Sequence, residues 1–91
     1  METSAPAQAA AKAATGFWLQ LGAFGQRDAA VGFQQRVAKD ASWLAPLMTI
    51  FNERKLHRLQ AGPYASRADA SSAAARLRDA LQYLPPVVER R

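Results

Sequence analysis

A tryptophan, two glutamines and an arginine stand at positions that favour recognition of a hydroxyl-rich ligand. Trp18 and Gln20 alternate with apolar residues along one short segment, and Arg58 and Gln60 do so along another. Amides and guanidinium groups form hydrogen bonds with hydroxyls, acetamido groups and carboxylates. An indole, or an aliphatic side chain such as Leu56, can cover the apolar face of a sugar ring. The alternative interpretation is an ordinary exposed sheet surface with cross-strand pairing.

Other kinds of chemistry find little support in the residue types. The chain has no Cys, which excludes a disulfide scaffold, a Cys-ligated zinc site and a thiol nucleophile. Its single histidine, His57, makes a His-based metal site improbable, and strand alternation points this side chain inward. The acidic residues show no paired spacing of the kind that a glycosidase sets across the scissile bond. We therefore expect no cofactor, no metal ion and no enzymatic activity.

Length and composition favour one small domain with an anionic partner. The chain has 91 residues, of which 49% are hydrophobic, and a net charge of +5. This is enough for one packed core but too short for a two-domain enzyme. The positive charge favours anionic partners without saying which. No apolar run approaches the ~20 residues of a membrane span, so we expect none in this chain.

Residues 1–16 differ in composition from the rest. They are rich in alanine and contain no aromatic residue and no large aliphatic residue beyond Met1. Such a segment buries too little surface to offset the entropy of ordering it. It also lacks the leading basic residues and the Leu-rich centre of a signal peptide. We predict a disordered Ala-rich linker over 1–16 and a folded domain over 17–91; the alternative for the linker is a marginal Ala-rich helix.

The chain repeats itself at an offset of 40 residues. Residues 20–27 read QLGAFGQR, and residues 60–67 read QAGPYASR. Two copies are too few for a solenoid, but two strand–helix–strand units suit a pseudo-symmetric α+β domain. The repeat places Gln20 and Gln60 at equivalent positions, which favours a functional interpretation of both.

Hydrophobic periodicity predicts six elements in the order βαββαβ. Alternation predicts strands over 17–23, 47–51, 56–61 and 87–90. The helical period predicts helices over 27–41 and from a Ser66 cap to Leu84, where two prolines stop the second helix. The polar run 52–55 indicates a hairpin turn. Right-handed crossovers give a ferredoxin-like (RNP-like) two-layer sandwich, an antiparallel four-stranded sheet with both helices on one face.

This topology leaves the other face of the sheet open to water. The strands 17–23 and 56–61 lie at its centre. If Leu19 and Leu59 face the helices, the intervening side chains face outward, and these are Trp18, Gln20, Leu56, Arg58 and Gln60.

At this point the residues resemble a known family. Residues 17–24 (FWLQLGAF) followed by 27–30 (RDAA) resemble the opening of a SPOR domain, and residues 56–70 (LHRLQAGPYASRADA) resemble its second half. The most specific part is Gly-Pro-aromatic followed by a small residue, Ser and Arg, at 62–67. The likeness covers residues 17 to about 90. Within the family, the Leu-His-Arg run at 56–58 is most similar to the C-terminal domain of bacterial rare lipoprotein A.

The resemblance implies a function as well as a fold. Such domains bind peptidoglycan glycan strands that lack stem peptides, without catalysis, and so target cell-envelope proteins to the division septum. It implies a periplasmic domain of a longer exported protein, which we expect to be monomeric. Carried over by position, the glycan-binding residues are Gln20, Ala23, Leu56 and Arg58. Leu56 stands where an aromatic can occur and Ala23 where Ser can occur; we expect Trp18 to supply the ring-covering surface and Gln60 to assist.

Two other functions remain as alternatives. RNA-recognition modules share the βαββαβ topology, but they stack bases on two or three aromatics of the central strands. Trp18 is the one outward aromatic that we place there, so we expect no nucleic acid as partner. A protein–protein interaction domain is the other alternative. The salt dependence of binding distinguishes RNA binding from sugar binding. RNA affinity falls steeply with ionic strength, whereas sugar affinity depends on it only moderately.

Overall fold

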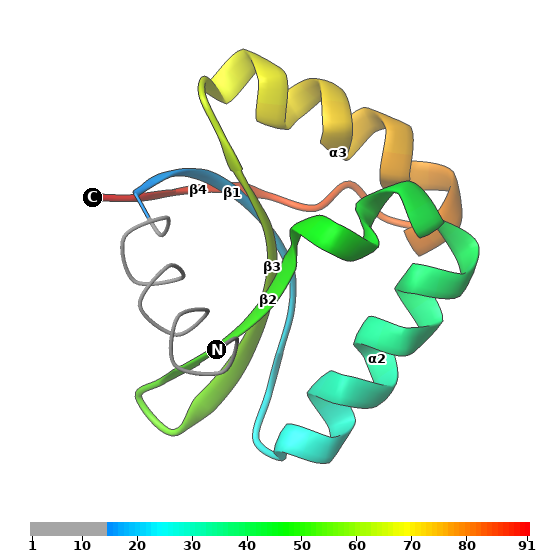
Figure 1. Ribbon diagram of the computed structural model, residues 1–91, viewed down its shortest axis with the longest axis vertical. Coiled ribbons are helices and arrows are strands. Elements are labelled where there is room, and N and C mark those ends of the chain that lie inside the picture. The colour runs from blue at the N-terminus through cyan, green and yellow to red at the C-terminus, as the bar shows by residue number, and fades with distance from the viewer. Residues whose placement is uncertain (1–14) are drawn as a thin grey trace, which may run out of the picture.

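The computed structural model describes residues 15–91 and has the predicted two-layer α+β architecture. The strands are β1 (Gly16–Phe24), β2 (Met48–Glu53), β3 (Leu56–Tyr64) and β4 (Val87–Arg90), paired antiparallel in the order β2-β3-β1-β4. The helices α2 (Arg27–Asp40) and α3 (Arg67–Leu81) cover the convex side of the curved sheet, and the 3-10 helix η1 (Ser42–Leu47) links α2 to β2 (Figure 1). The predicted fold class is therefore confirmed.

The predicted linker lies almost entirely outside the described residues. These begin at Thr15, and Gly16 is already the first residue of β1. Among residues 15–91, no helix is both long enough and apolar enough to cross a membrane.

Local signals explain where the second helix begins and ends. The Ser66 hydroxyl oxygen accepts a hydrogen bond from the backbone N–H of Asp69 at 3.0 Å, which is the expected N-cap. The helix ends at Leu81, three residues before the predicted end at Leu84. Gln82 takes a left-handed conformation with φ 66°, and its backbone N–H donates to the Arg78 carbonyl. The cap, rather than the two prolines, terminates the helix.

The hydrophobic core lies between the sheet and the helices. Leu19 of β1, Leu59 of β3 and Leu77 of α3 are fully buried in it. Each such side chain contributes about 1.5–3 kcal/mol through burial. Alanines on the inner face of α3, Ala70 and Ala74 among them, are also buried, so the helix can approach the sheet closely. This layer fixes β1 and β3 as the rigid centre of the domain.

An irregularity in β1 sets which of its side chains share a face. Gln20 lies opposite Gln60, but Ala23 lies opposite Arg58, with a register shift between Gln20 and Gly22. An extra residue in one strand is a β-bulge. Because side chains otherwise alternate, residues three apart would face opposite sides. The bulge brings Gln20 and Ala23 onto the same face.

The β2–β3 hairpin is tighter than the sequence predicts. Only Arg54 and Lys55 separate the strands, and both have positive φ, at 51° and 67°. This is the backbone geometry of a two-residue type I′ turn. The predicted turn over 52–55 was wrong at its start, because β2 continues to Glu53, which pairs with Leu56.

Candidate functional site

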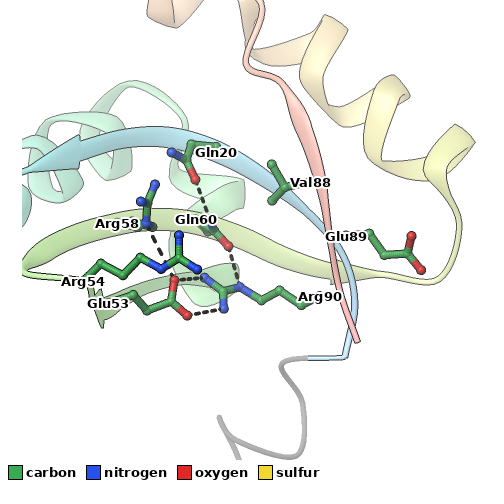
Figure 2. Close-up of a pocket in the computed structure, with 8 residues that line it drawn as sticks. All are labelled: Gln20, Glu53, Arg54, Arg58, Gln60, Val88, Glu89 and Arg90. Carbon is green, nitrogen blue, oxygen red and sulfur yellow. Dashed lines mark hydrogen bonds and ion pairs between the residues drawn. The ribbon is translucent and has the colours of Figure 1, made fainter.

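One face of the sheet lies opposite α2 and α3 and carries no helix of residues 15–91 (Figure 1); it is here called the helix-free face. This face has a groove of about 480 Å³. Its lining comes from all four strands and the β2–β3 turn, as Figure 2 shows. The lining residues are Gln20, Glu53, Arg54, Arg58, Gln60, Val88, Glu89 and Arg90. Gln20 and Arg58, the two predicted binding residues that matter most, thus line the same groove.

The two glutamines of the repeat contact each other at the bottom of this groove. Gln60 Nε2 donates to Gln20 Oε1 at 2.6 Å, and Arg90 Nε donates to Gln60 Oε1 at 2.8 Å. Gln60 is 2% exposed, so its amide is held in one orientation by these partners. Within residues 15–91, the amide nitrogen of Gln20 makes no hydrogen bond. Gln20 therefore keeps N–H donors for a ligand.

Glu53 ties the edge strands together across the groove. Arg90 donates to both carboxylate oxygens of Glu53, at 2.6 and 2.9 Å, in a bidentate pair. Arg58 Nε lies 3.7 Å from the same carboxylate. The hydrogen bond from Arg90 is the main reason that the pKa of Glu53 lies below its ordinary value of 4.5, since it outweighs the partial burial that raises the pKa. Coulombic attraction from Arg90, Arg58 and Arg54 lowers the pKa further.

An aromatic pair lies beneath these charges. The guanidinium of Arg90 lies 3.7 Å from the centroid of the Phe51 ring, within the range of a cation–π interaction. Trp18 packs edge-on against Phe51, with 5.1 Å between ring centroids. Arg90 is thus fixed by three contacts: Glu53, Gln60 and Phe51.

The structure corrects the exposure expected for Trp18. We expected its indole to be an exposed surface for a sugar ring, but Trp18 is 2% exposed. The ring lies between Phe51 and the backbone of Gly62, where a Cβ atom would come within 3.0 Å of it. The sheet is concave on this side (Figure 1), and Phe51 packs edge-on against the indole there. Trp18 supports the groove and does not line it.

The same correction applies to Gln60. It lies opposite Gln20 on the open face, as expected, but it is as buried as Trp18. Its place at the centre of the hydrogen-bond chain makes it a positioning residue for Gln20 and Arg90.

The remaining predicted site residues lie at the edge of the groove. Ala23 is exposed and pairs with Arg58, and Leu56 is half-buried and pairs with Glu53. Both therefore share a face with Gln20, although neither lines the groove itself. Their contact with a ligand stays a prediction.

Several contributors to the site were not singled out from the sequence. They are Phe51, Glu53 and Arg90, together with Arg54, Val88 and Glu89 of the lining. The four-residue turn that we predicted removed Glu53 from the strand. A two-residue turn would have placed Glu53 opposite Leu56 and Phe51 opposite Arg58. Arg90 could have been found from the outward alternation of the last strand, but its partners depend on the register of β4 against β1.

Two further residues lie outside the groove. His57 is half-buried and lies opposite Phe24, and its packing role stays a prediction. Trp43 packs against the core, and the Arg76 guanidinium lies 4.0 Å from its ring centroid. Within residues 15–91, no group of three or more His, Asp or Glu side chains is placed to hold a metal ion.

The fold and the groove define a small α+β module with a polar, charged groove on one face of its sheet. The profile of the SPOR domain family matches residues 13–89, and this chain belongs to that family. SPOR domains bind peptidoglycan and occur in proteins of the cell envelope. Comparison with curated proteins and with solved structures gives no match. The closer likeness to rare lipoprotein A stays a prediction.

Proposed function

We propose that this domain binds peptidoglycan glycan strands from which the stem peptides have been removed, and that it does so without catalysis. Such binding would hold its parent protein at the division septum, in the periplasm. The observation that carries the proposal is the placement of Gln20 and Arg58 in one groove on the helix-free face. Hydrogen-bond donors and positive charge there suit an anionic sugar polymer.

The chemistry of a peptide-free strand fits this groove. Amide cleavage of the stem peptide leaves a free carboxylate on each muramic acid, so the strand becomes thinner and anionic. Arg58 is 26% exposed in its side chain, and the charge of the chain is +5. An intact strand would bring bulky peptides onto the groove and would lack that carboxylate. Steric exclusion and loss of charge pairing both discriminate against it.

The expected affinity is modest. Each neutral hydrogen bond contributes about 0.5–1.5 kcal/mol net. A few such bonds and one charged contact suggest a dissociation constant in the micromolar range. Such a constant corresponds to a binding free energy of ~8 kcal/mol in magnitude.

The carboxylates of the groove favour binding over hydrolysis. A glycosidase needs a protonated acid with a raised pKa. The pKa of Glu53 is instead lowered, first by its hydrogen bond to Arg90. Glu89, the other acid of the lining, points away from Glu53 (Figure 2).

The aromatics of the open face argue against an RNA-binding module. Base stacking needs an accessible ring. Trp18 is buried, and Phe51 lies under the guanidinium of Arg90. Neither ring offers the free face that a nucleobase requires.

Retention on sacculi tests the proposal. We expect Gln20→Ala and Arg58→Ala to abolish retention of the domain by amidase-treated sacculi, because each removes a group that faces the groove. The matched controls are Gln35→Ala and Arg78→Ala, which delete the same groups from exposed positions of α2 and α3. Circular dichroism checks that each variant folds.

The controls should be retained like the unchanged domain, and untreated sacculi should retain less of it. Full retention of folded Gln20→Ala and Arg58→Ala would show that the glycan binds elsewhere. Equal retention by treated and untreated sacculi would remove the preference for peptide-free strands.

A further inference from the structure

Three arginines surround a single carboxylate in the groove. Arg54, Arg58 and Arg90, here called the guanidinium cluster, all act electrostatically on Glu53. Arg90 and Arg58 contact it directly, at 2.6 and 3.7 Å. Glu89 also lines the groove, but its carboxylate points away from the cluster and lies 3.8 Å from Arg91 Nε (Figure 2). The cluster therefore has more positive charge than its own acid neutralises.

We propose that Glu53 occupies, in the free domain, the position that a carboxylate of the glycan takes in the complex. The guanidinium cluster is then the subsite for the free carboxylate of muramic acid, and Glu53 is its intramolecular competitor. This inference rests on the proposed function and assigns one part of the ligand to one part of the groove.

The geometry around Arg90 supports a prepared carboxylate site. Its two terminal nitrogens hold Glu53 in the bidentate arrangement that arginine forms with any carboxylate. Its Nε is held by Gln60, and its plane lies over Phe51. The contacts with Gln60 and Phe51 do not depend on Glu53. The guanidinium of Arg90 therefore stays in place when the carboxylate of Glu53 leaves it. A site ordered in advance loses little entropy when a ligand binds.

The position of Glu53 supports its displacement. It is the last residue of an edge strand, directly before the Arg54–Lys55 turn, and its side chain is 40% exposed. An ion pair that is this exposed contributes little to stability, because water screens the attraction. The carboxylate can therefore rotate into water at small cost, whereas Arg90, with a side chain 17% exposed, cannot.

Competition of this kind lowers the apparent affinity. The apparent dissociation constant equals the intrinsic one divided by the fraction of molecules in which the cluster is available. Removing the charge of Glu53 raises that fraction. We expect Glu53→Gln to bind peptide-free glycan about three- to sixfold more tightly.

The test compares two ligands and two variants by isothermal titration calorimetry. One ligand is a peptide-free glycan oligomer; the other is the same oligomer with its carboxylates reduced to alcohols. Glu53→Gln should tighten binding of the first ligand and leave binding of the second unchanged. Asp79→Asn, which removes the same charge from an exposed position of α3 outside the groove, should change neither. Circular dichroism shows whether the variants are folded.

A measurement on the unchanged domain makes the test independent of any variant. The Nε–H signal of Arg90 in a nitrogen–proton correlation spectrum should shift with the carboxylate glycan and not with the reduced glycan, because only the first replaces Glu53. Unchanged or weaker binding by Glu53→Gln, or an equal gain for both ligands, overturns the inference. If the unchanged domain binds the carboxylate glycan and the reduced glycan with equal affinity, the proposed glycan binding is supported but the proposed carboxylate subsite is wrong. If it binds neither, the proposed function falls as well.

Discussion

The two faces of the sheet are made from the same strands but are held together by opposite means. On the covered face, Leu19 and Leu59 pack against the helices in an apolar layer. On the open face, the next residues along the same strands, Gln20 and Gln60, join a chain of hydrogen bonds and ion pairs. Apolar packing needs only shape, whereas the polar chain needs every partner in place. The comparison indicates that stability resides mainly on the covered face. The proposed function assigns recognition to the open face, so mutations should separate the two.

The largest effect is expected on the covered face. Leu59→Ala should lower the free energy of unfolding by about 2–5 kcal/mol, because it leaves a cavity beneath the helices. Gln20→Ala, one strand away on the open face, should lower it less, by about 1–2 kcal/mol, because it leaves the buried amide nitrogen of Gln60 without its acceptor. Urea denaturation followed by circular dichroism measures both. An equal loss of unfolding free energy in the two variants would contradict the view that the covered face provides most of the stability.

A smaller and pH-dependent effect is expected on the open face. The pKa of Glu53 is lowered in the folded state, so its ion pairs stabilise the fold above the unfolded pKa. This contribution is lost as pH falls through the folded pKa. We expect Glu53→Gln to lower the free energy of unfolding by about 0.5–1 kcal/mol at pH 7, a value that takes account of solvent screening.

The difference between Glu53→Gln and the unchanged domain should shrink below the ordinary pKa of 4.5 and vanish in stronger acid. Urea denaturation at a series of pH values measures it, with Glu89→Gln as the control. A difference that grows as pH falls would contradict the direction assigned to this pKa.

The smallest effect is expected at the turn that places Glu53 in β2. Lys55 has φ 67°, a left-handed conformation that costs a residue with a Cβ atom about 1 kcal/mol more than glycine. Lys55→Gly should therefore stabilise the fold by about 0.5 kcal/mol or less, because the greater entropy of the unfolded chain offsets part of the gain, and the melting temperature should rise slightly. Ser71→Gly, in the exposed middle of α3, should do the reverse by a similar amount. Destabilisation by Lys55→Gly would contradict the turn geometry.

Most of the fold could be predicted because it depends on local patterns. Alternation identified β1 and β3, the helical period identified α2 and α3, and Ser66 marked the start of α3. The repeat gave Gln20 and Gln60 equivalent positions on the two central strands, and the register shows that they lie opposite each other. The errors lay at boundaries that backbone conformation decides, namely the Arg54–Lys55 turn and the left-handed Gln82.

The site was harder to predict because its contacts join edge strands. Glu53 and Arg90 are 37 residues apart and belong to β2 and β4, the two edges of the sheet. Neither carries a sequence signal for the other, and their contact depends on the registers of three strand pairs. Strand alternation predicts which face of the sheet a side chain is on, but not how exposed it is there. Trp18 was therefore predicted to be exposed, although it is buried on that face.

A nitrogen–proton chemical-shift titration of the domain with peptide-free glycan tests the central claim most directly, with an intact muropeptide as the control. We predict that the signals that move with peptide-free glycan belong to the groove, Gln20 and Arg58 foremost, and that the muropeptide moves them far less. Shifts confined to α2 and α3, or equal shifts with both ligands, would contradict the assignment of glycan recognition to the open face.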